Sequence, residues 1–394
     1  MPTYLTPGVY VEEVKGGARP IEAVGTSTPA FLGVAPDPNA RVGEPVACNS
    51  WSQFAKEYVR EGDASTDLSH AVFGFFLNGG TRCWIVNVGS GGSIAGGGTT
   101  RRGVDLLDPI DEISMVAAPG FTGAAAYETL LAHCEKLRDR VAILDPPAEV
   151  EQIEDLTRVA TAGGDEEEDG DEPPGLRPRE SPDGYGALYF PWITVRDALD
   201  PQSMVHVPPS GHIAGIYSRS DAQRGVHKAP ANEPILGAVN VAYRVTHQEQ
   251  GVLNPVGVNV IRLFALDGIR VWGARTLAAS SSESRYLNVR RLLIMIEQSI
   301  KRSTSWLVFE PNDQKLWKSI RRDVSAFLTL VWRDGALFGE TPEQAFFVKC
   351  DDETNPPEII DAGQLVIQIG VAPVKPAEFV IFRIGLSAGG SESA

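Results

Sequence analysis

The sequence predicts an α/β and α+β protein, in which an α/β middle domain precedes a helix-backed mixed-sheet C-terminal core domain with N- and C-terminal strand arms. Three patterns support this prediction. Apolar runs alternate with helical patterns between residues 30 and 145, which is typical of an α/β layer. Two long amphipathic helical patterns stand among apolar runs between residues 258 and 371. Short β-rich runs stand near both ends, at 6–14 and 376–385.

The length of the chain predicts several domains, because 394 residues exceed what a single hydrophobic core usually holds. We expect an N-terminal arm at 1–22 that is part of the inner core domain, an α/β middle (outer) domain at 23–250, a C-terminal inner core domain at 251–374 and a C-terminal arm at 375–394. A mobile acidic loop is expected near 163–182, because a stretch rich in Gly, Pro and acidic residues cannot bury a core.

The elements of the middle domain follow from apolar runs and their flanking residues. A strand is expected at 30–35, since turn-forming Pro and Asn residues follow it. Ser50 or Asn49 caps a helix at 51–58, and a Gly pair ends a second helix at 68–77. The further elements expected here are a strand at 83–88, a flexible glycine-rich linker at 90–98, a helix or loop at 104–113, strands at 114–119 and 140–145, a helix at 124–139 and a strand at 185–195.

The C-terminal region is expected to form one helix-backed sheet. Its two helices are predicted at about 286–303 and 313–333, where apolar side chains recur at helical spacing. Asn312 or Asp313 caps the second helix. The strands expected to form the sheet lie at 258–264, 268–275, 306–309, 345–349 and 365–371.

Charge and cysteine content exclude several classes of function. A formal net charge of −16 argues against nucleic-acid binding, which needs a basic surface. The four cysteines are far apart and in no zinc-binding pattern, so they are expected to be reduced thiols that fill the core. No apolar run is long enough to cross a bilayer, and no secretory signal is expected, which favours assembly in the cytoplasm. We expect neither a metal nor a cofactor.

Three residues suggest an enzyme and are weighed against a structural interpretation. Asp145 follows a predicted strand, as many catalytic carboxylates do, but it also precedes two prolines and fits a turn. Ser210 and His212 resemble a nucleophile and base, but their spacing does not fix a hydrogen bond, and the chain has no Gly-x-Ser-x-Gly motif. We expect a turn that leads into a helix at this point, and no catalytic residue.

A basic patch stands out in this acidic chain. Lys315, Lys318, Arg321 and Arg322 lie close together around one side of the second C-terminal helix. They fall in its first half, where the helix dipole disfavours cations, so a dipole effect does not explain them. The two interpretations are a solvated helix face and a docking face for an acidic partner.

The apolar runs near both ends predict strands that join a sheet, and if that sheet belongs to a neighbouring subunit, the chain is built to be woven into a polymer. Chain termini are usually polar and frayed, so β-forming residues there suggest strands that join a sheet. The residues that we assign to these inter-subunit arms are Val9, Tyr10, Val11, Glu12, Val14, Phe379, Val380, Ile381, Phe382 and Ile384.

Together, these segments resemble the contractile tail-sheath family of phage tails and phage-tail-like injection systems. The most diagnostic segment is Asp267-Gly268-Ile269-Arg270-Val271-Trp272-Gly273-Ala274-Arg275-Thr276-Leu277. The other segments that carry the resemblance are Pro7 to Val14, Arg19 to Glu22, Gly25 to Ser27, Gly79 to Trp84, Val207 to Gly215, Leu253 to Pro255 and Pro376 to Val380. The short middle region, without large outer decorations, is most similar to sheath proteins of extracellular or cytoplasmic injection systems.

The resemblance implies a structural subunit that stacks as helical rings around an inner tube. The two arms would add strands to the C-terminal domains of neighbouring subunits, and contraction would drive the tube through a target envelope without nucleotide. Gly16–Gly17 and Pro373–Pro376 would be the flexible linkers. The implied partners are other sheath subunits, the inner tube protein, and baseplate and terminal cap proteins, with the four basic residues against the tube. The particle would be assembled in the cytoplasm and stay there or be released.

Two other functions remain as alternatives. The first is an α/β hydrolase that uses Ser210 or Asp145, which would require titratable groups to converge in the fold. The second is a non-contractile structural protein such as a tube or capsid subunit. A tube protein would normally be much shorter and lack two arms.

Overall fold

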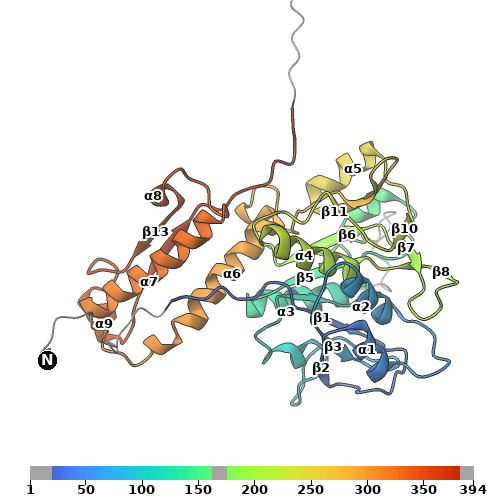
Figure 1. The fold of residues 1–394 in the computed structure, drawn as a ribbon, viewed down its shortest axis with the longest axis horizontal. Coiled ribbons are helices and arrows are strands. Elements are labelled where there is room, and N and C mark those ends of the chain that lie inside the picture. Colours follow the sequence, from blue (N-terminus) through green and yellow to red (C-terminus); the bar gives the residue numbers. More distant parts are fainter. Residues whose placement is uncertain (1–19, 162–174, 382–394) are drawn as a thin grey trace, which may run out of the picture.

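The computed structural model describes residues 20–161 and 175–381, and Figure 1 shows their arrangement. A nine-stranded sheet forms the centre of the larger lobe. The order of its strands is β2 (Pro45–Cys48), β3 (Cys83–Asn87), β1 (Pro29–Gly33), β4 (Met115–Ala117), β5 (Val141–Leu144), β6 (Gly186–Phe190), β11 (Val258–Phe264), β12 (Gly268–Val271) and β9 (Glu233–Pro234).

The strands from β3 to β11 in this order are parallel, and antiparallel strands close both edges. All residues of β1, β4, β5 and β6 are buried. Burial on both faces explains why these strands are continuous apolar runs without polar alternation. The prediction of an α/β layer from these runs is confirmed.

Helices cover this sheet, and the N-termini of some of them are capped by the side chain that precedes the helix. Their bounds are α1 (Trp51–Tyr58), α2 (Asp67–Leu77), α3 (Ala124–Leu137), α4 (Ser210–Arg224) and α5 (His247–Leu253). Helix α2 contacts β1, whereas α3 and α4 contact β4 and β5. Ser50 caps α1 and Thr66 forms a capping box at α2. Short 3-10 helices lie at Gly103–Leu107, Ile153–Thr157, Asn254–Val256, Glu283–Arg285 and Ser305–Leu307.

Helices α2 and α4 lie against each other at glycines. A Cβ atom on Gly211 would lie 2.2 Å from the Ala71 Cα, and one on Gly215 would lie 2.5 Å from the Phe75 carbonyl oxygen. Any larger residue at these two positions would therefore separate the helices. This contact holds α4 in the larger lobe. Helix α4 is the helix that was predicted to follow a turn at this point of the chain.

A second, smaller lobe follows in the chain and lies at the left of Figure 1. Its elements are α6 (Leu287–Ser303), α7 (Gln314–Arg333), α8 (Pro342–Ala345), β13 (Phe346–Lys349), α9 (Pro357–Asp361) and β14 (Gln368–Val371). Asp313, one of the two predicted candidates, caps α7. Helix α6 joins the lobes, because its Leu287 and Ile294 belong to the core of the larger lobe and its Leu292 and Ile296 to the core of the smaller one.

The predicted composition of the C-terminal sheet is wrong in two respects. The strands expected at 258–264 and 268–275 are β11 and β12, and they extend the nine-stranded sheet because β11 pairs with β6 in parallel. The strand expected at 306–309 is a 3-10 turn, and Phe309 has a φ of 71°, which a strand residue does not adopt. The smaller lobe is left with a two-stranded sheet of β13 and β14.

Other expectations need smaller corrections. The single strand expected at 185–195 is two strands, β6 and β7 (Ile193–Arg196), and β7 forms a separate sheet with β8 (Met204–Val207) and β10 (Ala238–Val241). The strand expected at 365–371 is shortened to β14. Residues 175–182 of the predicted mobile loop are held in place, since Arg177 and Ser181 are buried and Arg179 pairs with Glu128 and Glu135. The acidic run itself lies outside the described residues.

Candidate functional site

The two-stranded sheet of the smaller lobe is the first part of a candidate assembly site. Strands β13 and β14 are antiparallel, with Phe346 opposite Val371 and Lys349 opposite Gln368. Apolar side chains on one face, including Val348 and Ile369, pack against the core that α6 and α7 form. An isolated pair of strands is only marginally stable, so this sheet depends on that packing.

Both outer edges of this sheet have unpaired strand positions. The Ala372 N–H donates to the Ala345 carbonyl at 2.9 Å, which sets the phase of the antiparallel ladder. The peptide groups of Val348 on β13 and of Ile369 and Val371 on β14 therefore point away from the partner strand. Within residues 175–381, β13 and β14 pair along their length only with each other. The sheet can accept a further strand at its edges by backbone hydrogen bonding.

The second part is the C-terminal segment after β14, which leaves the body of the molecule as an extended chain (Figure 1). Its Glu378 carboxylate accepts hydrogen bonds from Arg275 Nε at 2.9 Å, Arg275 Nη2 at 2.7 Å and Asn254 Nδ2 at 2.9 Å, and the Tyr286 hydroxyl lies at 3.3 Å. Partial burial raises the pKa of Glu378, but the hydrogen bonds from Arg275 and Asn254 outweigh it and lower that pKa. Glu378 is therefore an ionised anchor for this segment.

Beyond the anchor, three predicted arm residues project into solvent. Phe379, Val380 and Ile381 are 70%, 70% and 80% exposed. Three consecutive exposed apolar residues next to a fixed anchor are unusual on a soluble surface and mark a segment that another surface covers. The predicted arm residues Phe382 and Ile384 lie outside the described residues, as do all those predicted in the N-terminal arm, Val9, Tyr10, Val11, Glu12 and Val14.

The N-terminal segment enters the described structure along α6. Ile21 is buried in the core of the smaller lobe. The backbone N–H of Glu22 donates to Ser303 Oγ at 3.3 Å and that of Val24 to Ser299 Oγ at 3.0 Å, so the segment runs antiparallel to the helix. Residues 21–24 thus lie against the smaller lobe, whereas Glu378 ties the C-terminal segment to the larger one.

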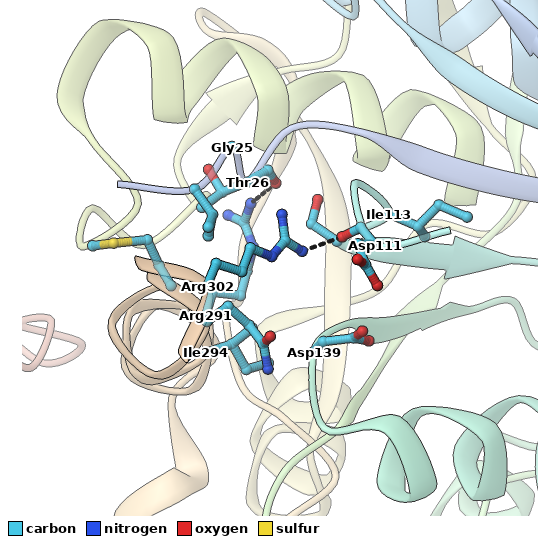
Figure 2. A pocket seen from close by; sticks show the side chains of 12 residues that line it. Gly25, Thr26, Asp111, Ile113, Asp139, Arg291, Ile294 and Arg302 are labelled. Carbon is cyan, nitrogen blue, oxygen red and sulfur yellow. Dashed lines mark hydrogen bonds between the residues drawn. The ribbon is translucent and has the colours of Figure 1, made fainter. Parts of the chain in front are cut away.

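Two arginines of α6 hold the junction between the lobes, which Figure 2 shows from close by. Arg291 donates to Asp221 Oδ2 of α4 at 2.6 Å and to the Thr26 carbonyl at 3.0 Å, and both side chains of the ion pair are at least 95% buried. Arg302 donates to the Asp111 carbonyl. A cavity of about 20 Å³, enough for one water molecule, lies between these groups. The bonds of Arg291 and Arg302 therefore tie α6 to the larger lobe.

The predicted basic patch lies on α7. Lys315, Lys318 and Arg322 are exposed, and Arg321 is half-buried. Arg322 donates to Asp323 Oδ1 at 3.0 Å. Lys315, Lys318 and Arg321 form no ion pair with any residue that the structure describes, so most of the charge of this patch is uncompensated within residues 20–161 and 175–381.

The residues considered for an enzyme do not form a catalytic group. The Ser210 N–H and Oγ donate to the Asp145 carboxylate at 2.8 and 2.6 Å, so Asp145 holds the N-terminus of α4. Complete burial raises the pKa of Asp145 to about 7, although both bonds from Ser210 favour the carboxylate. His212 is buried against Gly74 of α2, its Nδ1 has no partner among the described residues, and burial lowers its pKa to about 3. No hydrogen bond joins Ser210 to His212 in the described chain, which a serine nucleophile would need.

One group of side chains is close enough to share a metal ion. Ligand atoms of Asp105, Asp108 and His133 all lie within 4.8 Å of one another. However, Lys136 Nζ lies 2.9 Å from Asp108 Oδ2, and Arg140 Nη1 lies 3.5 Å from His133 Nε2. The Lys136 and Arg140 cations balance the charge of the carboxylates and repel a metal ion. We therefore interpret the group as a structural cluster of ion pairs.

Cys48, Cys83, Cys134 and Cys350 are all buried and unpaired, as expected for core thiols. None of the helices in the described part of the chain is both long and apolar enough to cross a bilayer.

Comparison with known protein families supports the resemblance across more than half of the chain. The model of the phage tail sheath protein central domain matches residues 182–277, and that of the phage tail sheath C-terminal domain matches residues 279–387. The boundary between the two matches falls just before α6, where the smaller lobe begins.

Solved structures of contractile injection systems are similar over almost the whole chain. A chain of the PVC sheath complex in the contracted state, from an extracellular contractile injection system, has 29% identity and a TM-score of 0.77, covering 98% of this chain and 99% of that chain. A chain of the six-fold symmetrised baseplate of the anti-feeding prophage has 30% identity and a TM-score of 0.75, covering 98% of this chain and 100% of that chain.

Curated phage proteins are similar over a smaller share of their length. The tail sheath protein of Salmonella phage ViI is 27% identical over 328 residues, which are 79% of this chain and 49% of the phage protein. The chain spans 26% to 49% of the length of the curated tail sheath proteins it matches.

Proposed function

This chain belongs to the phage tail sheath family, and we propose that it is a structural subunit of a contractile injection system or phage tail. In this proposal it polymerises as helical rings around an inner tube by strand exchange between subunits. Contraction of the polymer then drives the tube through a target envelope. The resemblance to a sheath chain in the contracted state supports this function.

The observation that carries the proposal is the open-edged sheet of β13 and β14. A two-stranded sheet with outward-directed peptide groups at Val348 and Ile369 is an incomplete unit. Added strands would supply the backbone hydrogen bonds that these edges lack. The arms of neighbouring subunits are the strands that we assign to these edges.

The two arms start from different lobes, which suits a connected mesh. We propose that the N-terminal arm, which starts from the α6 side, and the C-terminal arm, which starts from the Glu378 anchor, reach different neighbours. Subunits can then pivot as rigid bodies while backbone pairing between them persists.

The linker predicted at Pro373–Pro376 is in part bonded to the body of the protein. The Val374 N–H donates to the Ala336 carbonyl at 3.1 Å, and Asn288 Nδ2 donates to the Val374 carbonyl. We therefore propose residues 375–377 as the flexible linker of the C-terminal arm and Gly16–Gly17 as that of the N-terminal arm.

We place the smaller lobe on the inside of the polymer and the larger one on the outside. The inner domain would then begin near residue 279, where the matched C-terminal domain begins, and not at 251 as the sequence suggested. The uncompensated basic face of α7 supports this orientation, because it offers an acidic partner a docking surface. We assign the inner tube protein as that partner, through Lys315, Lys318, Arg321 and Arg322.

The remaining partners and the location are proposed from the similar particles. Baseplate and terminal cap proteins would bound the polymer at its ends, and a chain of a baseplate assembly is among the similar structures. Assembly would take place in the cytoplasm, and the particle would stay there or be released. We propose no enzymatic activity, because Asp145, Ser210 and His212 act in packing. Nucleic-acid binding and insertion into a membrane are not part of the proposal.

Removing the apolar side chains of the C-terminal arm tests the proposal. Changing Phe379, Val380 and Ile381 together to Ser leaves the Glu378 anchor in place and removes the faces that a neighbour would bury. The variant should remain folded and fail to polymerise. The matched control is Leu266→Ser, because Leu266 is 98% exposed on the hairpin between β11 and β12 and is not in an arm. Normal sheaths from the arm variant would contradict the strand-exchange model.

A further inference from the structure

A cavity of about 490 Å³ opens beside the nine-stranded sheet and is lined in part by residues that follow β1 and β4. We propose that it binds an organic cation, namely an ammonium or guanidinium group carried on an apolar body. This inference does not depend on the polymer and goes beyond the structural role proposed above.

The cavity lies where the order of the parallel strands reverses. Strand β3 pairs with one side of β1, and β4 pairs with the other side of β1 and is followed by β5. Val34 follows β1 directly, and Pro119, Gly120 and Phe121 follow β4, and all of them line the cavity. Loops at the carboxyl ends of strands diverge at such a switch point, which leaves a crevice that ligands occupy in open α/β sheets.

Asp67, at the first position of α2, presents a carboxylate to this cavity. A Cβ atom on Gly120, which has a φ of 79°, would lie 2.1 Å from Asp67 Oδ2, so the carboxylate rests against the Gly120 backbone. Through this carboxylate Asp67 forms no hydrogen bond or ion pair with any residue in the described ranges. Burial raises its pKa. A partly buried carboxylate without a partner is costly, so a cation that pairs with it is bound favourably.

The lining of the cavity includes a second carboxylate, that of Asp197, which is also held in place. Asp197 Oδ1 accepts hydrogen bonds from Ser65 Oγ and from the N–H groups of Leu199 and Asp200, the latter two at 2.8 and 2.9 Å. These bonds outweigh partial burial and lower the pKa of Asp197, so it is ionised. Its Oδ2 lies 3.7 Å from Nε2 of His70.

His70 leaves the charge of the cavity negative. It is 7% exposed and lines the cavity, and its Nδ1 has no hydrogen-bond partner among the described residues. Burial lowers the pKa of His70 more than Asp197 raises it, so the ring is neutral at pH 7. No Lys or Arg is among the described residues that line the cavity. Two carboxylates without a permanent cation favour a positively charged ligand.

The remaining lining selects an organic cation over a bare metal ion. Leu68, Phe121 and Val205 supply apolar surface beside the carboxylates, and an aromatic ring also attracts a cation. The volume falls in the range of about 300–1,000 Å³ that is usual for small-molecule sites. The ligand atoms of Asp67, Asp197 and His70 are not among the described groups close enough to share one metal ion. The cation can come from a free small molecule or from a Lys or Arg side chain of an adjacent copy.

Calorimetric titration of the full chain with 2-phenylethylammonium chloride tests the site. The unassembled protein should bind this cation, and the neutral analogue 2-phenylethanol should bind at least about tenfold more weakly, because it lacks the charge that the carboxylates recognise. This comparison needs no variant. Equal binding of the two compounds, or no binding of either, would overturn the proposal.

Variants locate the site and the source of the cation. Asp67→Asn should weaken binding at least about tenfold, whereas the control Asp352→Asn, an exposed carboxylate of the smaller lobe, should leave it unchanged. Unchanged binding by a folded Asp67→Asn protein would contradict the proposal. Binding that persists in assembled sheaths assigns the site to a free molecule. Binding that is lost on assembly and present before it assigns the site to a side chain of the adjacent copy.

Discussion

The Arg275 guanidinium donates two hydrogen bonds to the Glu378 carboxylate, from Nε at 2.9 Å and from Nη2 at 2.7 Å. Arg275 lies just after β12 of the larger lobe, and Glu378 immediately precedes the exposed arm residues Phe379 to Ile381. The contact therefore fixes the point from which the C-terminal arm leaves the molecule. Because both groups are largely buried and a two-point bond constrains direction as well as distance, it also fixes the angle of departure.

Removing this anchor should impair assembly more than folding. Glu378→Ala leaves the Arg275 guanidinium without its carboxylate, which should lower the free energy of unfolding by about 1–3 kcal/mol. The arm then loses its fixed origin, and the yield of sheaths in electron micrographs should fall sharply. Glu358→Ala, on the exposed surface of α9, is the matched control and should assemble normally. Sheaths of normal length and number from Glu378→Ala would show that the anchor has no part in assembly.

Charge reversal on α7 should separate the sheath from the tube. We expect the combined variant Lys318→Glu, Arg321→Glu and Arg322→Glu to fold and to polymerise, but to lose co-purification with the tube protein, because like charges would then face each other. The effect on stability should be small, since these side chains lie at the surface.

The control for this variant reverses the same number of charges elsewhere. Lys56→Glu, Arg101→Glu and Arg102→Glu change exposed residues of the larger lobe and alter the net charge equally. If this control loses the tube as well, net charge and not the α7 face governs the association. If the α7 variant keeps the tube, the basic patch is only a solvated helix face.

The ion pair at the lobe junction should contribute strongly to stability. Arg291→Ala would leave Asp221 as a buried, unpaired charge and should lower the free energy of unfolding by about 3–5 kcal/mol, as measured by urea denaturation. Replacing both partners with apolar residues, Arg291→Met with Asp221→Leu, should recover most of this loss, since no charge then remains buried. A single variant that loses less than the double variant would contradict this account of the junction.

Because His212 is buried, we expect the free energy of unfolding to decrease as the pH falls. Its pKa is lowered to about 3 in the folded chain, so between that value and about 6.5 the unfolded state binds the proton and the folded state does not. The contribution of His212 to the free energy of unfolding is greatest above about pH 6.5. It decreases as the pH falls and is about 2 kcal/mol smaller at pH 5.

His212→Phe keeps a ring of similar size against Gly74 and removes the titration. The difference in unfolding free energy between pH 7.5 and pH 5 should therefore be about 2 kcal/mol smaller in this variant than in the wild type. Comparison of the two proteins cancels the contribution of His133, whose pKa burial likewise lowers, to about 4. An unchanged difference would show that His212 does not titrate with unfolding.

Local signals in the sequence predicted much of the secondary structure. Ser50 and Asp313 cap α1 and α7, and each was one of two predicted candidates, because an N-cap depends on a side chain and the backbone within three residues of it. The apolar stripes of α6 and α7 also gave the right helices. Each of these features is decided by neighbours in the chain.

Long-range pairing could not be read from the sequence. The run Val258–Phe264 has the composition of a buried strand in either lobe, and only its pairing with β6, some 70 residues earlier, decides which sheet it joins. The Glu378 anchor was missed for the same reason, since its partner Arg275 lies 103 positions away. The cavity beside Asp67 depends on loops after β1 and β4 that are far apart in the chain.

The central claim is that this chain polymerises into a hollow sheath, and negative-stain electron microscopy of the purified full-length protein tests it most directly. The protein should be expressed alone and together with its tube partner. We predict striated hollow cylinders whose diameter identifies the extended or contracted state. Uniform globular particles under both conditions would contradict the strand-exchange model.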